Sequence, residues 1–216
     1  MDVADPQRNY LNELAARLDE SLGERLMSVL SIGSYALGAF DPKSSDLDVI
    51  VVVDRPLTVS DWDAVVDSCS HESLPVPARK LELVAYTRPQ VAAPRRNQGW
   101  ELNFHTGPGV RHAGHDPMAE SWHWFVLDLA QARDTAITLY GEPASVVIGE
   151  VSDNLVQDAL AACLTWYELH EPGPQLMLAA ARAWRGSAEK RWSSKREAGE
   201  WAATYVDAKL GRDVER

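Results

Sequence analysis

Two short segments constrain the fold of this chain more than any other feature. Residues 31–34 read Ser-Ile-Gly-Ser, and residues 45–48 read Ser-Asp-Leu-Asp and run directly into the apolar stretch 49–53. This pattern predicts a strand ending at a Gly-Ser turn, a helix opened by that turn, and a buried strand entered through two carboxylates. Because side chains alternate along a strand, we expect Asp46 and Asp48 to lie on the same face.

Two carboxylates on one face repel each other, and a cation between them removes that cost. Magnesium binds carboxylate oxygens and keeps open positions for phosphate, so the pair indicates metal-assisted phosphoryl or nucleotidyl transfer. Gly33 and Ser34 complement it, because glycine lets the backbone approach a phosphate and N–H groups at a helix N-terminus bind anions. An Asp-x-Asp pattern alone usually lies in a solvated loop. The Gly-Ser turn before it and the apolar run after it favour a metal site instead.

Charge and composition indicate which kinds of molecule the chain can bind. The chain has 216 residues, of which 45% are hydrophobic and 25% charged, and its net charge is −11. The negative charge disfavours a nucleic-acid partner and favours a cationic small molecule. No apolar run reaches the roughly 20 residues of a membrane span. Cys69 and Cys163 show no metal or redox spacing, which indicates buried thiols. We therefore expect a cytoplasmic monomer that binds neither membrane nor nucleic acid.

The order of predicted elements indicates an α/β protein with two domains. Helices are expected from Pro6 and from Ser60, and strands at 26–32, 48–53, 80–86 and 100–105, with a Pro/Arg loop at 88–97. From residue 117 the apolar period is helical, with helices expected at 124–140, 154–169, 175–192 and 194–210. This predicts a mixed sheet flanked by helices in residues 1–150 and an α-helical bundle in residues 151–216.

A third carboxylate, Glu82, lies between Leu81 and Leu83 in a predicted strand. Glutamate is rarely tolerated in such an apolar setting without a partner. If this strand lies beside that of Asp48, Glu82 joins the aspartates as a metal ligand or a general base. The alternative is that Glu82 occupies the solvent face of an alternating strand.

Basic residues and histidines form two further groups. Six basic residues and one acid occur between Arg182 and Arg196, a pattern that suits a clamp for nucleotide phosphates but is also typical of a solvated face. His112-x-x-His115 lacks a second ligand pair, so zinc is disfavoured and these histidines, like His105 and His123, are expected at the surface or in loops. Most of the eight tryptophans are expected to pack in the core, while Trp100 is less clearly internal.

Taken together, Gly33-Ser34, Asp46-x-Asp48 and Glu82 resemble the nucleotidyltransferase superfamily. More closely, the chain resembles aminoglycoside adenylyltransferases of the streptomycin/spectinomycin 3″/9 class. The resemblance extends over most of the chain. The further segments that carry it are residues 124–129 (Trp-Phe-Val-Leu-Asp-Leu), 139–141 (Leu-Tyr-Gly), 179–184 (Ala-Ala-Ala-Arg-Ala-Trp) and 193–201 (Ser-Ser-Lys-Arg-Glu-Ala-Gly-Glu-Trp).

The resemblance implies a nucleotidyltransferase fold followed by a helical domain, with ATP and an aminoglycoside as substrates. Asp46 and Asp48 would hold magnesium, as two ions, together with Glu82, which would also deprotonate the acceptor hydroxyl. Arg182 and Lys195 would contact the triphosphate. The residues expected to contact the acceptor are Trp100, Glu168 and Glu171.

The predicted function is therefore magnesium-dependent transfer of AMP from ATP to a hydroxyl of a cationic small molecule of the aminoglycoside type. Two alternatives stay open. One is nucleotidyl transfer to another small molecule or to a protein side chain. The other is a non-catalytic, nucleotidyltransferase-like antitoxin or binding module. The complete set of acids and Lys195 favours an enzyme, and the added helical domain disfavours a minimal antitoxin.

Overall fold

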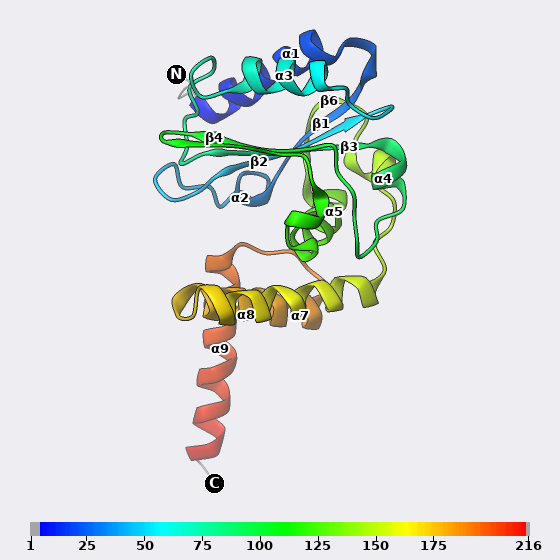
Figure 1. The fold of residues 1–216 in the computed structure, drawn as a ribbon. Coiled ribbons are helices and arrows are strands. Elements are labelled where there is room, and N and C mark those ends of the chain that lie inside the picture. The colour runs from blue at the N-terminus through cyan, green and yellow to red at the C-terminus, as the bar shows by residue number, and fades with distance from the viewer. Residues whose placement is uncertain (1–4, 215–216) are drawn as a thin grey trace. The chain divides into compact units, whose positions relative to one another are not determined.

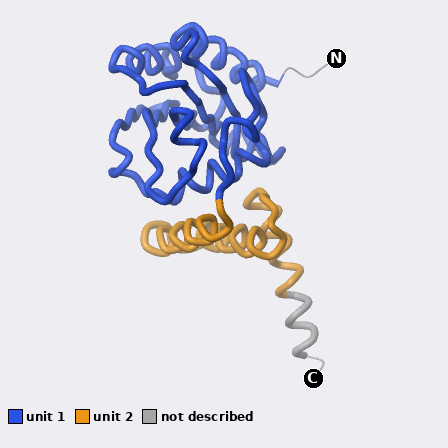
Figure 2. The backbone as a smooth tube through the Cα atoms, turned by 90° about the vertical axis from the view of Figure 1, so that its right-hand side faces the viewer, with its two compact units in different colours: residues 1–151 blue, residues 152–216 orange. Residues whose placement is uncertain are grey.

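The computed structural model describes residues 5–214, with side chains up to residue 206. The chain forms two compact units, residues 1–151 and residues 152–216 (Figure 2). The first unit contains the sheet and the second is helical. None of the helices in the described part of the chain is long and apolar enough to cross a membrane.

A six-stranded sheet forms the centre of the first unit, in the order β5-β4-β3-β2-β1-β6 (Figure 1). Its strands are β1 (Leu26–Ile32), β2 (Leu47–Val53), β3 (Leu81–Thr87), β4 (Leu102–Gly107), β5 (Val110–Gly114) and β6 (Ile137–Gly141). Only β2 and β3 run parallel, and the other described neighbours are antiparallel. This confirms the predicted mixed sheet flanked by helices.

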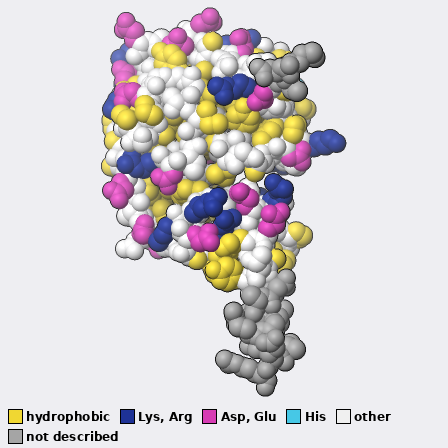
Figure 3. Space-filling view, turned by 180° about the vertical axis from the view of Figure 1, so that it is seen from behind, with side chains coloured by type: hydrophobic (Ala, Val, Ile, Leu, Met, Phe, Trp, Pro, Cys, Tyr) yellow, Lys and Arg dark blue, Asp and Glu magenta, His cyan; other side chains and the backbone are white. Residues whose placement is uncertain are grey.

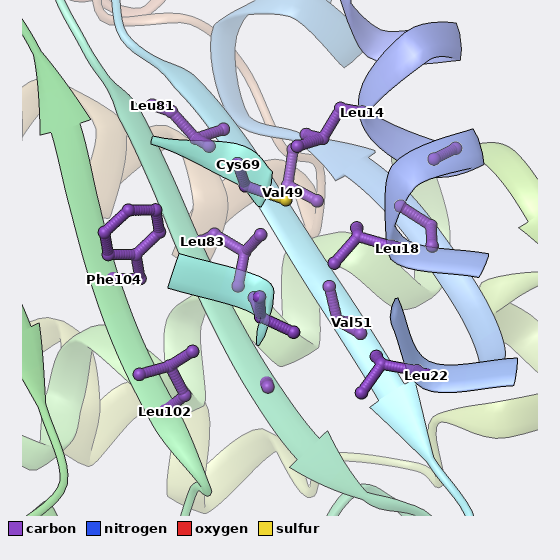
Figure 4. Packing of buried hydrophobic residues seen from close by; sticks show 14 of the residues in the cluster. Leu14, Leu18, Leu22, Val49, Val51, Cys69, Leu81, Leu83, Leu102 and Phe104 are labelled. Carbon is purple, nitrogen blue, oxygen red and sulfur yellow. The ribbon is translucent and has the colours of Figure 1, made fainter. Parts of the chain in front are cut away.

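One face of the sheet is covered by α1 (Pro6–Leu22) and α3 (Val59–Cys69) (Figure 1). Leu14 and Leu18 of α1 pack on Val49 and Val51 of β2 in a fully buried cluster (Figure 4). Both helices begin at side-chain caps: Asp5 accepts hydrogen bonds from the backbone N–H groups of residues 7 and 8, and Thr58 caps α3. A three-residue turn, η1 (Gly23–Arg25), links α1 to β1.

The opposite face is covered over only part of its length. Here α5 (Trp122–Thr135), α4 (Arg88–Ala92) and α6 (Ala144–Val147) pack on apolar residues of β1, β2 and β3, among them Leu30, Val52 and Tyr86. The short α2 (Gly33–Ala36) follows β1, and η2 (Pro117–Ala119) precedes α5. The apolar cover does not extend to the N-terminal ends of β2 and β3, which carry Asp48 and Glu82 on this face.

Three segments differ from the sequence-based expectations. The helix predicted to run to Tyr140 ends at Thr135, and residues 137–141 form β6 against β1. The run Ile-Thr-Leu-Tyr is too short for its periodicity to separate helix from strand, and pairing with β1 decides it. Residues 110–114, where no strand was predicted and His112 was expected at the surface or in a loop, form the edge strand β5. The predicted Pro/Arg loop contains the short helix α4.

The second unit consists of α7 (Asp153–His170), α8 (Pro174–Glu189) and α9 (Lys195–Val214), close to the three predicted helices. Lys190 Nζ lies 2.7 Å from Asp153 Oδ2 and ties the end of α8 to the start of α7. Trp184 of α8 contacts Trp201 and Tyr205 of α9, with ring centroids 4.9 and 5.6 Å apart. Acidic and basic side chains are interspersed on the face drawn in Figure 3, so the net charge is not gathered into one patch there.

Candidate active site

A row of four polar side chains crosses the sheet on its partly covered face. Asp48 of β2 pairs in register with Glu82 of β3, Glu82 pairs with His105 of β4, and His105 pairs with His112 of β5. Directly opposed residues on neighbouring strands present their side chains to the same face. The residues before the first three (47, 81 and 104) pack on the other face, under α1 and α3. The row therefore brings two carboxylates and two imidazoles together.

The placement of Glu82 decides between its two predicted readings. Glu82 lies beside Asp48 rather than on a separate solvent face, and its side chain is 33% exposed. The pairing depends on the parallel arrangement of β2 and β3, which aligns the second residue of each strand. Its role as base and metal ligand remains a prediction.

Gly33 leaves room for the Asp48 carboxylate. The Gly33 backbone has a φ of +63°, and a Cβ atom there would lie 2.0 Å from Asp48 Oδ2. Any side chain at this position would therefore collide with the carboxylate, besides adopting a conformation that L-residues rarely use. Ser34 follows as the second residue of α2 and is half-buried. The predicted phosphate-binding turn thus lies directly against the first acid of the row.

Asp48 is in an environment that disfavours its negative charge. Burial, together with the negative charges of Glu82, Asp128 and Asp46, raises the pKa of Asp48 well above its usual value, and a hydrogen bond with Glu82 contributes. Asp48 therefore holds a proton more readily than an ordinary aspartate unless a cation neutralises its charge. Asp128 reaches this region from α5; a single acid within an apolar helical stretch was the sequence signal for it, and no role was predicted.

Two cations at the start of β3 contact the acids, and sequence reasoning did not identify either. Arg79 holds Asp46 through two hydrogen bonds, Nε to Oδ1 at 2.8 Å and Nη2 to Oδ2 at 2.5 Å. Asp46 in turn raises the pKa of Arg79. Lys80 forms an ion pair with Glu82, and its Nζ lies 3.9 Å from Asp46 Oδ2. Two adjacent basic residues directly before the strand of Glu82 were the available signal.

The donor chemistry of the site fits a divalent cation. Asp48 and Glu82 supply adjacent carboxylate oxygens, the ligands that magnesium prefers, and a cation would relieve the cost of their shared burial. Among the side chains that the structure describes, however, no three acidic, histidine or cysteine groups are gathered closely enough to hold a metal. Asp46 is instead hydrogen-bonded to Arg79. Asp48 and Glu82 would therefore hold the ion, and Asp46 would join them by exchanging its guanidinium partner.

Trp100, the predicted acceptor contact in the first unit, is buried, and its role stays a prediction. Its side chain is 3% exposed and packs in the cluster beneath the sheet, with its ring centroid 5.8 Å from that of Phe125. It also fills the space beside Gly114, where a Cβ would lie 3.3 Å from the indole. Contacts with Gly114 of β5 and Phe125 of α5 account for its burial, and a direct acceptor contact would require the ring to move.

His105 and His123 differ from the expected surface or loop positions, whereas His112 and His115 are exposed as expected. His105 is half-buried in β4, where its Nε2 lies 3.0 Å from Asn103 Oδ1 and its ring centroid 5.5 Å from that of His112. Burial lowers the pKa of His105. His123 is buried in α5, and desolvation lowers its pKa to about 4. His115 stacks on Trp62 of α3, at a centroid distance of 4.3 Å.

Four predicted site residues belong to the second unit, and their roles remain predictions. Lys195 is the first residue of α9; its Nζ donates to Gln175 Oε1 at 2.8 Å and lies 5.7 Å from the Tyr167 ring centroid. Arg182 is half-buried within α8. Glu168 near the end of α7 and Glu171 at its C-cap are exposed.

Comparisons with known proteins agree with this geometry. Residues 11–86, which include the Gly-Ser turn and all three predicted acids, match the family model of the nucleotidyltransferase domain. The fold is similar to that of spectinomycin adenyltransferase AAD(9) from Enterococcus faecialis, in a crystal structure with ATP and spectinomycin. The TM-score is 0.71 at 18% identity, covering 91% of this chain and 82% of that one.

Two other comparisons add nothing to the argument. A toxin-antitoxin structure with AMP-PNP aligns with a TM-score of 0.35 at 11% identity, over 74% of this chain and 92% of that one, too weakly to bear on the fold. No curated protein sequence matches the chain significantly.

Proposed function

We propose that this chain, a nucleotidyltransferase, transfers AMP from ATP to a hydroxyl group of an aminoglycoside of the streptomycin/spectinomycin class. The observation that carries the proposal is the in-register pair of Asp48 and Glu82, with Gly33 packed against the first of them. The fold similarity to an adenyltransferase that was crystallised with ATP and spectinomycin supports the choice of both substrates.

In the proposed reaction Glu82 takes the proton of the acceptor hydroxyl. The freed oxygen attacks the α-phosphorus of ATP, a new phosphorus–oxygen bond forms, and the bond to pyrophosphate breaks. Lys80 keeps a positive charge beside Glu82 while the acceptor binds. Bound magnesium, held by Asp48 and Glu82 and by Asp46 after its release from Arg79, would neutralise the negative charge of the phosphates.

The second unit supplies the remaining proposed contacts. Lys195 and Arg182 would bind the triphosphate, since cationic side chains pair strongly with phosphate oxygens. Glu168 and Glu171 would attract the ammonium groups of the acceptor. Both carboxylates are exposed, and the net charge of −11 favours the approach of a cation over long range.

The direct test is to incubate the protein with Mg-ATP and a panel that includes streptomycin and spectinomycin, and to follow pyrophosphate release. We expect release that depends on an aminoglycoside, and an AMP adduct in the product mass spectrum. Release with a different hydroxyl compound or a protein acceptor would redirect the proposal to that acceptor. Binding of ATP with no transfer to any acceptor would favour a binding module.

A matched pair of variants tests the role of the base. Glu82→Gln preserves the shape of the side chain and removes the proton acceptor, so kcat should fall by roughly 10²–10⁴-fold. Glu20→Gln is the control, because Glu20 is exposed on α1, which covers the other face of the sheet. Equal kcat values for the two variants would remove Glu82 from the mechanism.

A further inference from the structure

The four neighbours of Glu82 on its own face restrict where an acceptor can be held. Asp48 and His105 lie opposite it on the adjacent strands, and Lys80 and Val84 precede and follow it by two residues along the chain. Asp48 is a candidate metal ligand, Lys80 is ion-paired with Glu82, and Val84 is apolar. His105 is the neighbour that can form a neutral hydrogen bond to an acceptor.

The orientation of the His105 ring is set from within its own strand. Its Nε2 lies 3.0 Å from Asn103 Oδ1, and with an oxygen as partner this nitrogen carries the hydrogen. In a neutral imidazole the other nitrogen, Nδ1, is then a hydrogen-bond acceptor. Within the described residues no hydrogen bond uses Nδ1. The contact between the His105 and His112 rings limits movement of His105 toward the sheet edge.

Opposed side chains in an antiparallel pair have Cβ atoms about 4.5–5.5 Å apart. Groups so close can bind two substituents on adjacent carbon atoms of one small molecule. We propose that His105 is a positioning residue for the acceptor: its Nδ1 accepts a hydrogen bond from an O–H or N–H group on the carbon next to the reacting hydroxyl, and thereby holds that hydroxyl against Glu82. The inference rests on the proposed function and specifies its substrate class, an acceptor with a hydrogen-bond donor adjacent to the modified hydroxyl.

The experiment compares three substitutions of His105. Asn places an oxygen near the position of Nδ1, whereas Gln extends toward the position of Nε2 and Ala places nothing at either. We expect His105→Ala and His105→Gln to raise the KM for spectinomycin or streptomycin by about 3- to 10-fold, the worth of one hydrogen bond, and His105→Asn to recover most of it. The KM for ATP should stay close to wild type and the variants should remain folded, although loss of the hydrogen bond to the buried Asn103 lowers the unfolding midpoint of His105→Ala.

His115→Ala is the matched control, because His115 packs on Trp62 of α3, which covers the opposite face of the sheet. A second arm uses acceptor analogues that lack the donor next to the modified hydroxyl, which is first identified by NMR of the product. In calorimetry, wild type should bind these analogues more weakly than the full acceptor. His105→Ala should bind the analogues and the full acceptor with the same affinity.

The positioning role would be overturned if wild type and His105→Ala lost the same affinity when the acceptor is replaced by the analogue. So would a KM loss that His105→Asn does not recover while its fold and ATP affinity are intact. The failure of the proposed function looks different: wild type would bind the acceptor in calorimetry without transferring AMP. In that case no product exists from which to choose analogues, and the calorimetric affinities of wild type and the three His105 variants for spectinomycin decide the role of His105: equal affinities would overturn it.

Discussion

Replacement of Gly33 by alanine is expected to affect both the stability of the fold and the rate of the reaction, and the two effects can be measured separately. The added methyl group would meet Asp48 Oδ2 at 2.0 Å and Cγ at 2.8 Å, where ordinary contacts begin at 3.4 Å. The carboxylate or the turn must therefore move by about 1 Å or more. The same alanine would also have to adopt a φ of +63°.

The two costs have different magnitudes and different consequences. The left-handed backbone costs an alanine roughly 1–2 kcal/mol of folding free energy, and the forced contact adds roughly 1–3 kcal/mol. A displacement of 1 Å in a reacting constellation lowers the rate by roughly 10²-fold. We therefore expect Gly33→Ala to fold with reduced stability and to lose most of its kcat.

Gly38→Ala provides a closely matched control. Gly38 has a φ of +67°, but nothing lies within 4 Å of the position of its Cβ. It should therefore show the backbone cost alone in urea unfolding, with pyrophosphate release close to wild type. If the two variants had the same unfolding free energy and the same kcat, the proposed crowding of Gly33 against Asp48 would be refuted.

The remaining predictions concern three charged groups. Asp48→Asn should abolish turnover while the fold persists, since it removes charge from the proposed cation site; near-normal turnover in magnesium would contradict this. Lys195→Ala should raise the KM for ATP more than the KM for the acceptor. Unchanged KM and kcat would show that Lys195 has no role in binding ATP. Arg25 and Thr58 hold the pKa of Asp61 well below its usual value, so Asp61 stabilises the fold above its unfolded-state pKa near 4, and this stability is lost as the pH falls below it. Asp61→Asn should accordingly flatten the fall of the thermal midpoint between about pH 5 and pH 2, and parallel curves for mutant and wild type would refute the linkage.

The strand pattern and the approximate start of most helices could be read from the sequence because they depend on local signals. The apolar run after Asp48 gives β2, and Asp5-Pro6 gives the start of α1. The proximity of Gly33 to the acids could be inferred for the same reason, since only residues 33–46, with the short α2, separate β1 from β2. The pairing of Glu82 with Asp48 could only be stated as one of two alternatives, because it depends on which strands are neighbours.

Features that depend on tertiary contacts could not be predicted from the sequence. β6 is short, and its pairing with β1, far away in the chain, overrides the helical period that precedes it. Trp100 could be assigned to the core only once its contact with Phe125 of α5, distant in the chain, was known. The contact between Arg79 and Asp46 spans 33 residues, and no periodicity encodes it.

The parallel pairing of β2 with β3 has a consequence for how activity arises during folding. A parallel pair cannot be closed by a tight hairpin; the chain between Val53 and Leu81 must first cross over the sheet, and α3 forms within that crossover. Asp48 and Glu82 become neighbours only when this long loop has closed, which makes their meeting a late and slow event compared with hairpin formation. Native helices can therefore return before β2 and β3 pair and bring the acids together, and the ability to transfer AMP is a more stringent test of the folded sheet than the helical circular dichroism signal.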